Sequence, residues 1–488
     1  MNFIRNKIEL IRSGGLPVLW QQMRAFVRWF YLSKYGSRVA YCGFRMAVFL
    51  RPNWAEGHAL LAETLISLGR FDEAFAAWER AFLLKPEWRD ICARVQQTFY
   101  IYGQIRAAES VVQRYLDAQN DFAREHQLDK LGIRFQGDFL TIIGHIALLD
   151  AYVKMGILGQ RSTARPILLI GPGLSNPCYL DYWRRYLPDM ITDPVALEIL
   201  WPLAKYLEDR YGAVMDSSGQ QIYELKTFNR ERAIQSQWEA EGRGLLLTLT
   251  GSDHERGWRC LRGLGVSADA WFVGMHVREG RVQGERNADI NTYRIAIESI
   301  VARGGWVIRM GDPSMTPLPA MPQVIDYAHS KVRSDWMDVF LWARCRFFIG
   351  TQSGPAWVPP TFGVPCVITN WPSMGIRLWF NKDLCIFKLN WSEREARYVN
   401  FAEVISSPLA RGECTQYRAS RGIKFVDNTP EEINDVVIEM LDRLDGKLHY
   451  SKEDEELQER FARLSSRRAS KANTRIGRAF LHKHAHLL

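Results

Sequence analysis

The sequence of 488 residues lacks several features that would place it in a specialised class at once. Its eight cysteines include no CxxC pair, which argues against a disulfide framework and against a zinc site. No apolar run is long enough to span a bilayer, and Arg5, Lys7 and Glu9 interrupt the apolar N-terminal stretch, so we do not expect it to act as a secretory signal. These absences predict a cytoplasmic protein with reduced, structural thiols.

Acidic residues are fewer than basic ones, which gives a net charge of +9 and a pI of about 9.1. The excess gathers near the C-terminus, at Arg467, Arg468, Lys471, Arg475, Arg478 and Lys483. Such a balance favours anionic partners, among them nucleotide diphosphates, acidic glycans and anionic lipid. No recognised nucleic-acid module accompanies the charge, so nucleic acid is not expected as a partner.

The N-terminal stretch leaves two alternatives open. Phe3, Ile8 and Ile11, together with Arg5 and Arg12, would suit a helix that lies on an anionic membrane, at its inner face. Alternatively, the same residues form a first helix that packs on the domain that follows.

An internal repeat occupies the first quarter of the chain. The stretch FRMAVFLRPNW (44–54) matches WERAFLLKPEW (78–88) at a spacing of 34 residues, and Gly69 recurs as Gly103. Small residues where two helices cross, glycine in the turn and proline after the second helix form the tetratricopeptide pattern. Residues 21–122 therefore resemble three such repeats, which bind peptides, self-associate or brace a neighbouring domain.

After residue 125 the pattern changes to short apolar runs that alternate with amphipathic segments. This rhythm predicts strand–helix units and a mostly parallel sheet. Strands are expected at 165–173, within 242–253 and at several places beyond 270, with a last helix that Thr429 caps. We predict four parts: repeats at 1–125, α/β halves at 126–265 and 266–445 with a cleft between them, and a basic helical tail at 446–488.

One candidate site lies in FFIGTQSGPAW (347–357), where a predicted strand runs into glycine and hydroxyl side chains and then into a short predicted helix. Unpaired N–H groups and the dipole at a helix N-terminus attract a diphosphate. Thr351 and Ser353 could donate hydrogen bonds, while Gly354 lets the main chain approach closely. The alternative is a purely structural turn.

The segment 334–371 resembles the nucleotide-sugar half of glycosyltransferases with two facing Rossmann-like domains, and heptosyltransferases most closely. In that family a Ser-Gly-Pro turn contacts the donor diphosphate, which implies this role for Ser353, Gly354 and Pro355. Trp357 stands where the family has histidine, so the identity of the donor stays open.

The motif MHVREG (275–280) ends the first predicted strand of the same half and is similar to the His-x-Arg motif of fucosyltransferases. The resemblance implies that Arg278 stabilises the leaving diphosphate, with its planar guanidinium, and that His276 orients the loop or the donor. Asp312, at the end of the next strand, could accept hydrogen bonds from the ribose or base. The alternatives are a salt-bridged Arg278, a core His276 and an ordinary turn aspartate.

A base that deprotonates the acceptor is expected from the first half. Heptosyltransferases have Gly-Asp near this point, and the matching residues here are Gly144 and His145. Histidine suits the role because it titrates near neutrality. The apolar neighbours of His145 leave a buried structural histidine as the alternative.

Taken together, the chain resembles a bacterial family of repeat-fused putative glycosyltransferases with a GT-B pair of domains. The resemblance implies an inverting transfer from a nucleotide-diphosphate sugar to a surface glycan or protein. No DxD pair is suitably placed, so we expect no metal and no cofactor beyond the donor. The competing hypothesis is a catalytically inactive scaffold that binds peptides or glycans.

Overall fold

A computed structural model describes residues 36–86, 89–137, 140–208, 213–215, 221–223, 231–280, 283–374, 380–412, 414–465 and 474–488. The chain divides into two compact units, Met1–Gln119 and Asn120–Leu488. The N-terminal stretch, for which a membrane-lying helix and a packed helix were the alternatives, lies outside the described residues. In the part of the chain that is described, no helix has both the length and the apolar character to cross a bilayer.

The first unit is helical and repeats one hairpin. Its helices are α2 (Gly36–Leu50), α3 (Ala55–Ser67), α4 (Phe71–Leu84), α5 (Arg89–Ile101) and α6 (Ile105–Glu125), the last of which continues into the second unit.

The same turn recurs 34 residues apart in this unit. Gly69 and Gly103 both have positive φ (74° and 77°), a conformation that glycine adopts at little cost. The N–H that follows each glycine closes its turn, with Arg70 N to Leu65 O at 2.9 Å and Gln104 N to Phe99 O at 2.8 Å. The structure therefore contains a helical repeat with the spacing that the sequence indicated, while its assignment as tetratricopeptide stays a prediction.

The second unit contains a seven-stranded sheet in the order β15-β11-β10-β9-β6-β7-β8, with every pairing parallel. Its strands are β6 (Phe272–His276), β7 (Trp306–Arg309), β8 (Val324–Asp326), β9 (Phe348–Gly350), β10 (Cys366–Trp371), β11 (Leu384–Phe387) and β15 (Arg475–Ile476). The first six are almost wholly apolar, as strands covered on both faces must be.

The chain order of these strands reverses at one place. From β6 the chain moves outward through β7 and β8, then crosses back so that β9 pairs with the other side of β6. In open α/β sheets, ligands bind outside the carboxyl ends of the strands at such a switch point. The β6–β9 junction is therefore where the topology leads us to look for a site.

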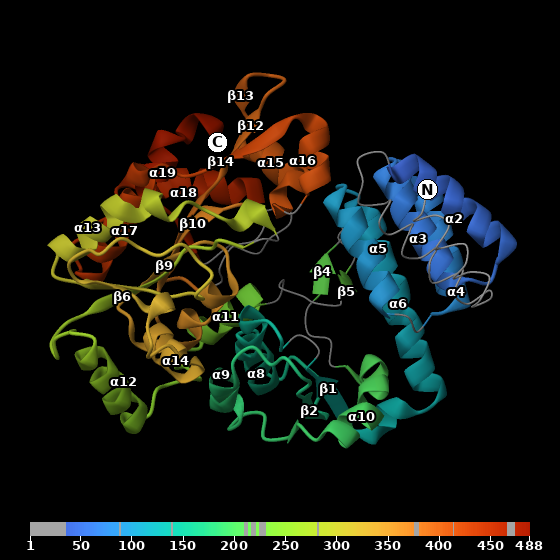
Figure 1. The fold of residues 1–488 in the computed structure, drawn as a ribbon, viewed down its shortest axis with the longest axis horizontal. Helices are drawn as coiled ribbons and strands as arrows, with labels where there is room; N and C mark the ends of the chain where they lie inside the picture. The colour runs from blue at the N-terminus through green and yellow to red at the C-terminus, as the bar shows by residue number, and fades with distance from the viewer. Residues whose placement is uncertain are drawn as a thin grey trace, which may run out of the picture. The chain divides into compact units, whose positions relative to one another are not determined.

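Helices α13 (Arg294–Ala302) and α17 (Pro430–Leu444) lie on one side of these strands, and α14 (Asp335–Arg344) on the other (Figure 1). The predicted caps of two of them are confirmed. Ser334 accepts from Met337 N at 3.2 Å, and Thr429 forms a capping box with Glu432.

The preceding segment carries a smaller parallel sheet of β1 (Ile133–Gln136), β2 (Arg165–Leu169) and β3 (Met190–Ile191), and a hairpin of β4 (Ala213–Met215) and β5 (Gln221–Tyr223). Its helices are α7 (Ile143–Ile146), α8 (Leu149–Ile157), α9 (Pro177–Trp183), α10 (Pro194–Leu207), α11 (Glu231–Ala240) and α12 (Gly251–Gly263).

The strand expected within 242–253 is absent from this segment. Thr250 instead caps α12, in a capping box with Asp253.

Between β11 and α17 the chain contains β12 (Leu389–Ser392), β13 (Arg397–Tyr398), β14 (Ile423–Val426), α15 (Phe401–Ser406) and α16 (Thr415–Arg421). The segment predicted as a helical tail contains the helices α18 (Lys452–Ser465) and α19 (Arg478–Lys483), and the short strand β15 between them. β15 pairs with β11, so the segment beyond 445 completes the large sheet. Its charge is also partly neutralised, because Arg475 pairs with Glu455 at 3.0 Å and Lys483 with Glu432 at 2.8 Å.

All eight cysteines are free, as the sequence predicted. Five of them are buried: Cys92, Cys345, Cys366, Cys385 and Cys414. Burial raises the pKa of the Cys345 thiol to about 12, so this side chain stays protonated and packs as a small apolar group.

Candidate functional site

The motif residues of two strands meet at the switch point. His276 is the last residue of β6, and it pairs in register with Gly350, the last residue of β9. The backbone continues this contact, since Thr351 N donates to His276 O at 3.2 Å. The two stretches that the sequence singled out, 275–280 and 347–357, are therefore side by side at the carboxyl edge of the sheet.

The hydroxyl groups of the second stretch hold the first stretch in place. Thr351 is fully buried, and its Oγ1 accepts a hydrogen bond from Arg278 N at 3.0 Å. Ser353 Oγ lies 3.1 Å from Nδ1 of His276. These contacts assign to both hydroxyls a role in fixing the loop after β6, where the sequence had predicted donors to a phosphate.

His276 is buried and uncharged at neutral pH. Burial, with the nearby positive charges of Arg309 and Arg278, lowers the pKa of His276 to about 4. A neutral imidazole carries one ring proton, so the hydrogen bond between His276 and Ser353 joins two uncharged groups whichever of them donates. The predicted orienting residue thus positions the Ser-Gly-Pro turn through a neutral hydrogen bond.

Arg278 is half-buried, and its guanidinium is held by the loop that follows β6. Nη1 donates to Gln283 O at 3.0 Å and to Asn287 Oδ1 at 2.5 Å. Asn287 also bonds both backbone groups of Gly280, at 2.9 Å and 2.7 Å. These contacts fix a permanently charged side chain beside the carboxyl end of β6.

Partial burial, and after it the neighbouring cation Arg286, lower the pKa of Arg278, and Glu285 opposes them. Arginine keeps its proton at any physiological pH, so the guanidinium stays charged in this partly buried position.

The predicted helix after the Ser-Gly-Pro turn is wrong. The chain forms two short 3-10 turns, Gly354–Trp357 and Pro359–Phe362, and no α-helix before β10. Three prolines in this stretch lack the N–H that an α-helix would use. The dipole of an α-helix is therefore not available to attract an anion at this turn.

The first half contributes α7 to the same place. A Cβ atom on Gly354 would lie only 2.7 Å from Ile143 Cγ2, and one on Gly144 only 3.0 Å from Gly354 Cα. Two glycines thus allow α7 to approach the Ser-Gly-Pro turn closely. His145, the predicted base, is the next residue of α7 and is half-buried.

Asp312 lies at the end of β7, and its side chain is exposed. Its Oδ1 accepts from Ser314 N at 2.8 Å, and hydrogen bonds from Ser314 lower the pKa of Asp312. This geometry is that of a turn aspartate, the alternative that the sequence left open. Its predicted contact with the donor stays a prediction.

The structure adds a buried cation that the sequence reasoning missed. Arg309, in β7, is fully buried and lies 3.0 Å from Asp326 and 3.6 Å from Glu279. Glu279 in turn accepts from the backbone and hydroxyl of Thr316, at 2.9 Å and 2.8 Å. The loop after β6 is therefore tied to the loop after β7, and an arginine inside an apolar strand was the available signal.

A second missed cation is Lys388, which follows β11 and is also buried. Its Nζ donates to Asn287 O at 2.7 Å and pairs with Asp427 at 2.7 Å. Because the Asn287 side chain binds Arg278, one residue connects two cations from distant parts of the chain. The predicted strands omitted β11, so no sequence signal placed Lys388 here.

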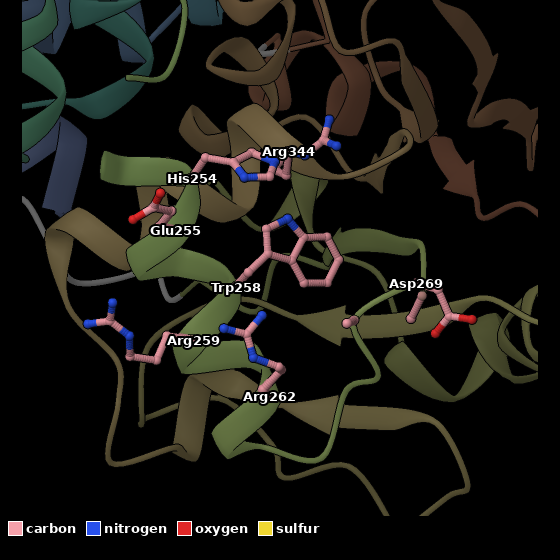
Figure 2. Close-up of a pocket in the computed structure, with 9 residues that line it drawn as sticks. His254, Glu255, Trp258, Arg259, Arg262, Asp269 and Arg344 are labelled. Atoms are coloured by element: carbon pink, nitrogen blue, oxygen red, sulfur yellow. The ribbon is translucent and has the colours of Figure 1, made fainter. Parts of the chain in front are cut away.

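A pocket of about 560 Å³ lies away from these residues, at the amino end of β6. Trp258 stands in it, with Arg259, Arg262 and Arg344 (Figure 2). Figure 2 shows the three guanidinium groups apart from one another, on different sides of Trp258. The arginines do not converge on one point, and we interpret this hollow as a solvated surface of α12.

Comparisons with known proteins gave no family model and no curated protein that matches the chain. Among solved structures, a glycosyl transferase family 9 protein from Veillonella parvula has 13% identity and a TM-score of 0.34, covering 49% of this chain and 81% of its own. An ADP-heptose lps heptosyltransferase II from E. coli has 11% identity and a TM-score of 0.32, covering 64% and 98%.

An O-GlcNAc transferase from Thermobaculum terrenum has 12% identity and a TM-score of 0.24, covering 92% of this chain and 87% of its own. Identities and TM-scores as low as these leave the functional argument to the site itself.

Proposed function

We propose that the protein is a glycosyltransferase that uses a nucleotide-diphosphate sugar as donor. The observation that carries the proposal is the position of Arg278 at the β6–β9 switch point, where Gln283 and Asn287 hold its guanidinium. A diphosphate needs such a charge most when it leaves, because negative charge then grows on its oxygens. The sequence motifs that contain Arg278 and Ser353 point to the same chemistry.

The residues suit an inverting transfer without a covalent intermediate. In this scheme His145 takes the proton of the acceptor hydroxyl while its oxygen attacks the anomeric carbon. The bond from that carbon to the diphosphate breaks, and Arg278 stabilises the departing oxyanion. Neutral His276 contributes by holding the Ser-Gly-Pro turn against the loop of Arg278.

The acceptor, by the same proposal, is a cell-surface glycan or a protein, and the helical repeats present it. The charge balance of +9 would favour an acidic acceptor or contact with an anionic membrane. Self-association through the repeats is compatible with this arrangement.

Thermal unfolding in the presence of nucleoside diphosphates and their sugars is the most direct test. A ligand at a hundred times its dissociation constant should stabilise the protein by about 2.7 kcal/mol. A nucleotide sugar that stabilises the protein should then be hydrolysed slowly, and the reaction can be followed by the release of its nucleoside diphosphate. If no nucleoside diphosphate stabilises the protein, the scaffold hypothesis is correct. If one binds but its sugar is never turned over, the fold has kept the donor site without activity.

A further inference from the structure

A second cavity lies at the opposite end of the sheet from the candidate site. Its volume is about 250 Å³, and α8, α11, the second 3-10 turn and the starts of β10 and β11 form its walls. The residues that line it and enter the argument are Lys154, Gln235, Trp238, Glu239, Phe380 and Asp383. Cys366 and Leu384 begin β10 and β11, whereas the candidate site lies where β6 and β9 end.

The size of this cavity limits its ligand. Pockets for drug-sized ligands and cofactors usually begin at roughly 300 Å³. A volume of about 250 Å³ is too small for a nucleotide sugar but accommodates a single six-membered ring. The cavity therefore needs a ligand of a different kind from that of the candidate site.

A buried ammonium group lines the cavity. Lys154 is almost completely buried, and its Nζ donates to Asp150 and, at 2.8 Å, to Gln235 Oε1. An ammonium has three hydrogens, so two named bonds leave one for a further acceptor. Nζ lies 5.5 Å from the ring centroids of both Trp238 and Phe380. The remaining hydrogen is thus available beside two aromatic rings.

Asp383 supplies a second unused polar group. Its side chain is fully buried, and Oδ1 accepts from Cys366 N at 2.7 Å. Oδ2 is buried and has no hydrogen-bond partner among the described residues. Burial raises the pKa of Asp383 well above its usual range, which favours the protonated carboxyl group. Buried groups of this kind are rarely left without a partner, which indicates that a ligand or water completes the site.

Two of the cations at the cavity are already paired with carboxylates, Lys154 with Asp150 and Arg243 with Glu241. A cation that is already paired attracts a further ion only weakly. The cavity offers hydrogen-bond donors and acceptors around two aromatic side chains, and a ring that carries hydroxyl groups has the matching apolar faces and polar rim.

We propose that this cavity binds one neutral, hydroxyl-rich ring of the size of a monosaccharide. This site is separate from the proposed transferase site, and neither proposal depends on the other. The hydroxyls would meet Lys154, Asp383 and Glu239, and the ring would lie beside Trp238 and Phe380.

Isothermal titration calorimetry of the full-length protein tests this proposal. The probes are glucose, galactose, mannose and myo-inositol, with glucose 6-phosphate and glucosamine as charged counterparts. At least one neutral ring should bind, and its charged counterpart should bind at least tenfold more weakly, which is about 1.4 kcal/mol. If no neutral ring binds, or if the phosphate binds more tightly, the proposal is wrong.

Variants locate the binding site. Leu245, which lines the cavity, is half exposed, so Leu245→Trp should fill the cavity without unfolding the protein and should abolish binding. Ile157→Trp, at the exposed end of α8, is the matched control and should leave binding unchanged. Asp383→Asn should keep the affinity within a few fold, because an amide can replace both the acceptor and the donor.

Arg278→Ala provides the last comparison, because it changes the candidate transferase site and leaves this cavity intact. Ring binding should be unaffected in this variant. Binding that survives Leu245→Trp, or that is lost in Arg278→Ala, would place the ring elsewhere and overturn the proposal.

Discussion

Arg278 is the residue on which the proposed chemistry depends most. Replacement by alanine removes the charge that meets the leaving diphosphate, and loss of such a donor typically costs about a hundred- to a thousandfold in kcat. Lysine keeps the charge but lacks the planar set of donors that a guanidinium presents to phosphate oxygens, so Arg278→Lys should also be poor. Steady-state kinetics with the stabilising donor measures both. Normal turnover by Arg278→Ala would remove this residue from the mechanism.

His276 makes stability depend on pH in a defined window. Its pKa of about 4 is below the ordinary value of 6.5, so the unfolded chain binds a proton in this range that the folded chain does not. Its neutral form therefore contributes fully above pH 6.5, and the contribution is lost as the pH falls toward 4. The shift corresponds to on the order of 3 kcal/mol.

The non-titrating variant His276→Gln isolates this effect. Urea unfolding at intervals between pH 4 and 7 should give a flatter pH dependence for the variant than for the wild type. The comparison is between slopes, so a constant loss of stability in the variant does not disturb it. Parallel slopes would mean that His276 takes up its proton at the same pH in the folded and the unfolded chain, so that burial does not lower its pKa.

At the scale of elements, the approach of α7 to the Ser-Gly-Pro turn depends on two glycines. In Gly144→Ala the new Cβ would meet Trp357 Cδ1 at 2.9 Å and Gly354 Cα at 3.0 Å, and the second contact is backbone that cannot rotate away. Overpacking of this kind costs about 1–3 kcal/mol, and it should move His145 away from the site, lowering kcat more than it raises KM.

Gly263→Ala is the control for this change. It lies in α12, and a Cβ there would have no neighbour within 4 Å. Alanine should leave activity intact and stabilise the helix by up to about 1 kcal/mol. Equal effects of the two substitutions on denaturant unfolding would show that the close approach is unimportant.

The sequence predicted those elements whose signals are local. Ser334 and Thr429 mark helix starts by side-chain bonds within one turn, so α14 and α17 could be found without knowing their neighbours. β11 and β15 are short and gain their stability from pairing with strands distant in the chain, which leaves little pattern to read. The predicted helix after Gly354 failed because its prolines permit only 3-10 turns.

The candidate site divides in the same way. Residues at the ends of consecutive strands could be grouped from the sequence, because parallel strands end at one edge. The links through Asn287 and Lys388 could not be predicted from the sequence. They join the loop after β6 to the end of β11, a strand that no sequence pattern indicated. Arg309 carried a signal, a lone charge in an apolar strand, and was passed over.

For the whole molecule, the boundary between the two units provides a test of what the repeats do. A fragment that begins at Leu128, after α6, keeps every element of the candidate site. It should bind the donor and hydrolyse it slowly as the full chain does, and it should no longer modify the native acceptor. Calorimetry measures donor binding by the fragment, and mass spectrometry of the acceptor measures sugar transfer.

Cooperative melting of the fragment is the control, because removal of α2–α6 could expose apolar surface. A fragment that melts cooperatively without donor binding would make the repeats part of the donor site. One that still modifies the acceptor would make them a brace or a contact between copies.

The position of β15 affects how the protein is made. Among the described residues, β11 gains its second neighbour from Arg475–Ile476, far beyond it in the chain. Until that segment has been made, this edge of β11 is unpaired, and an open strand edge can recruit another chain. Chains truncated between β11 and β15 are therefore expected to aggregate or to depend on chaperones.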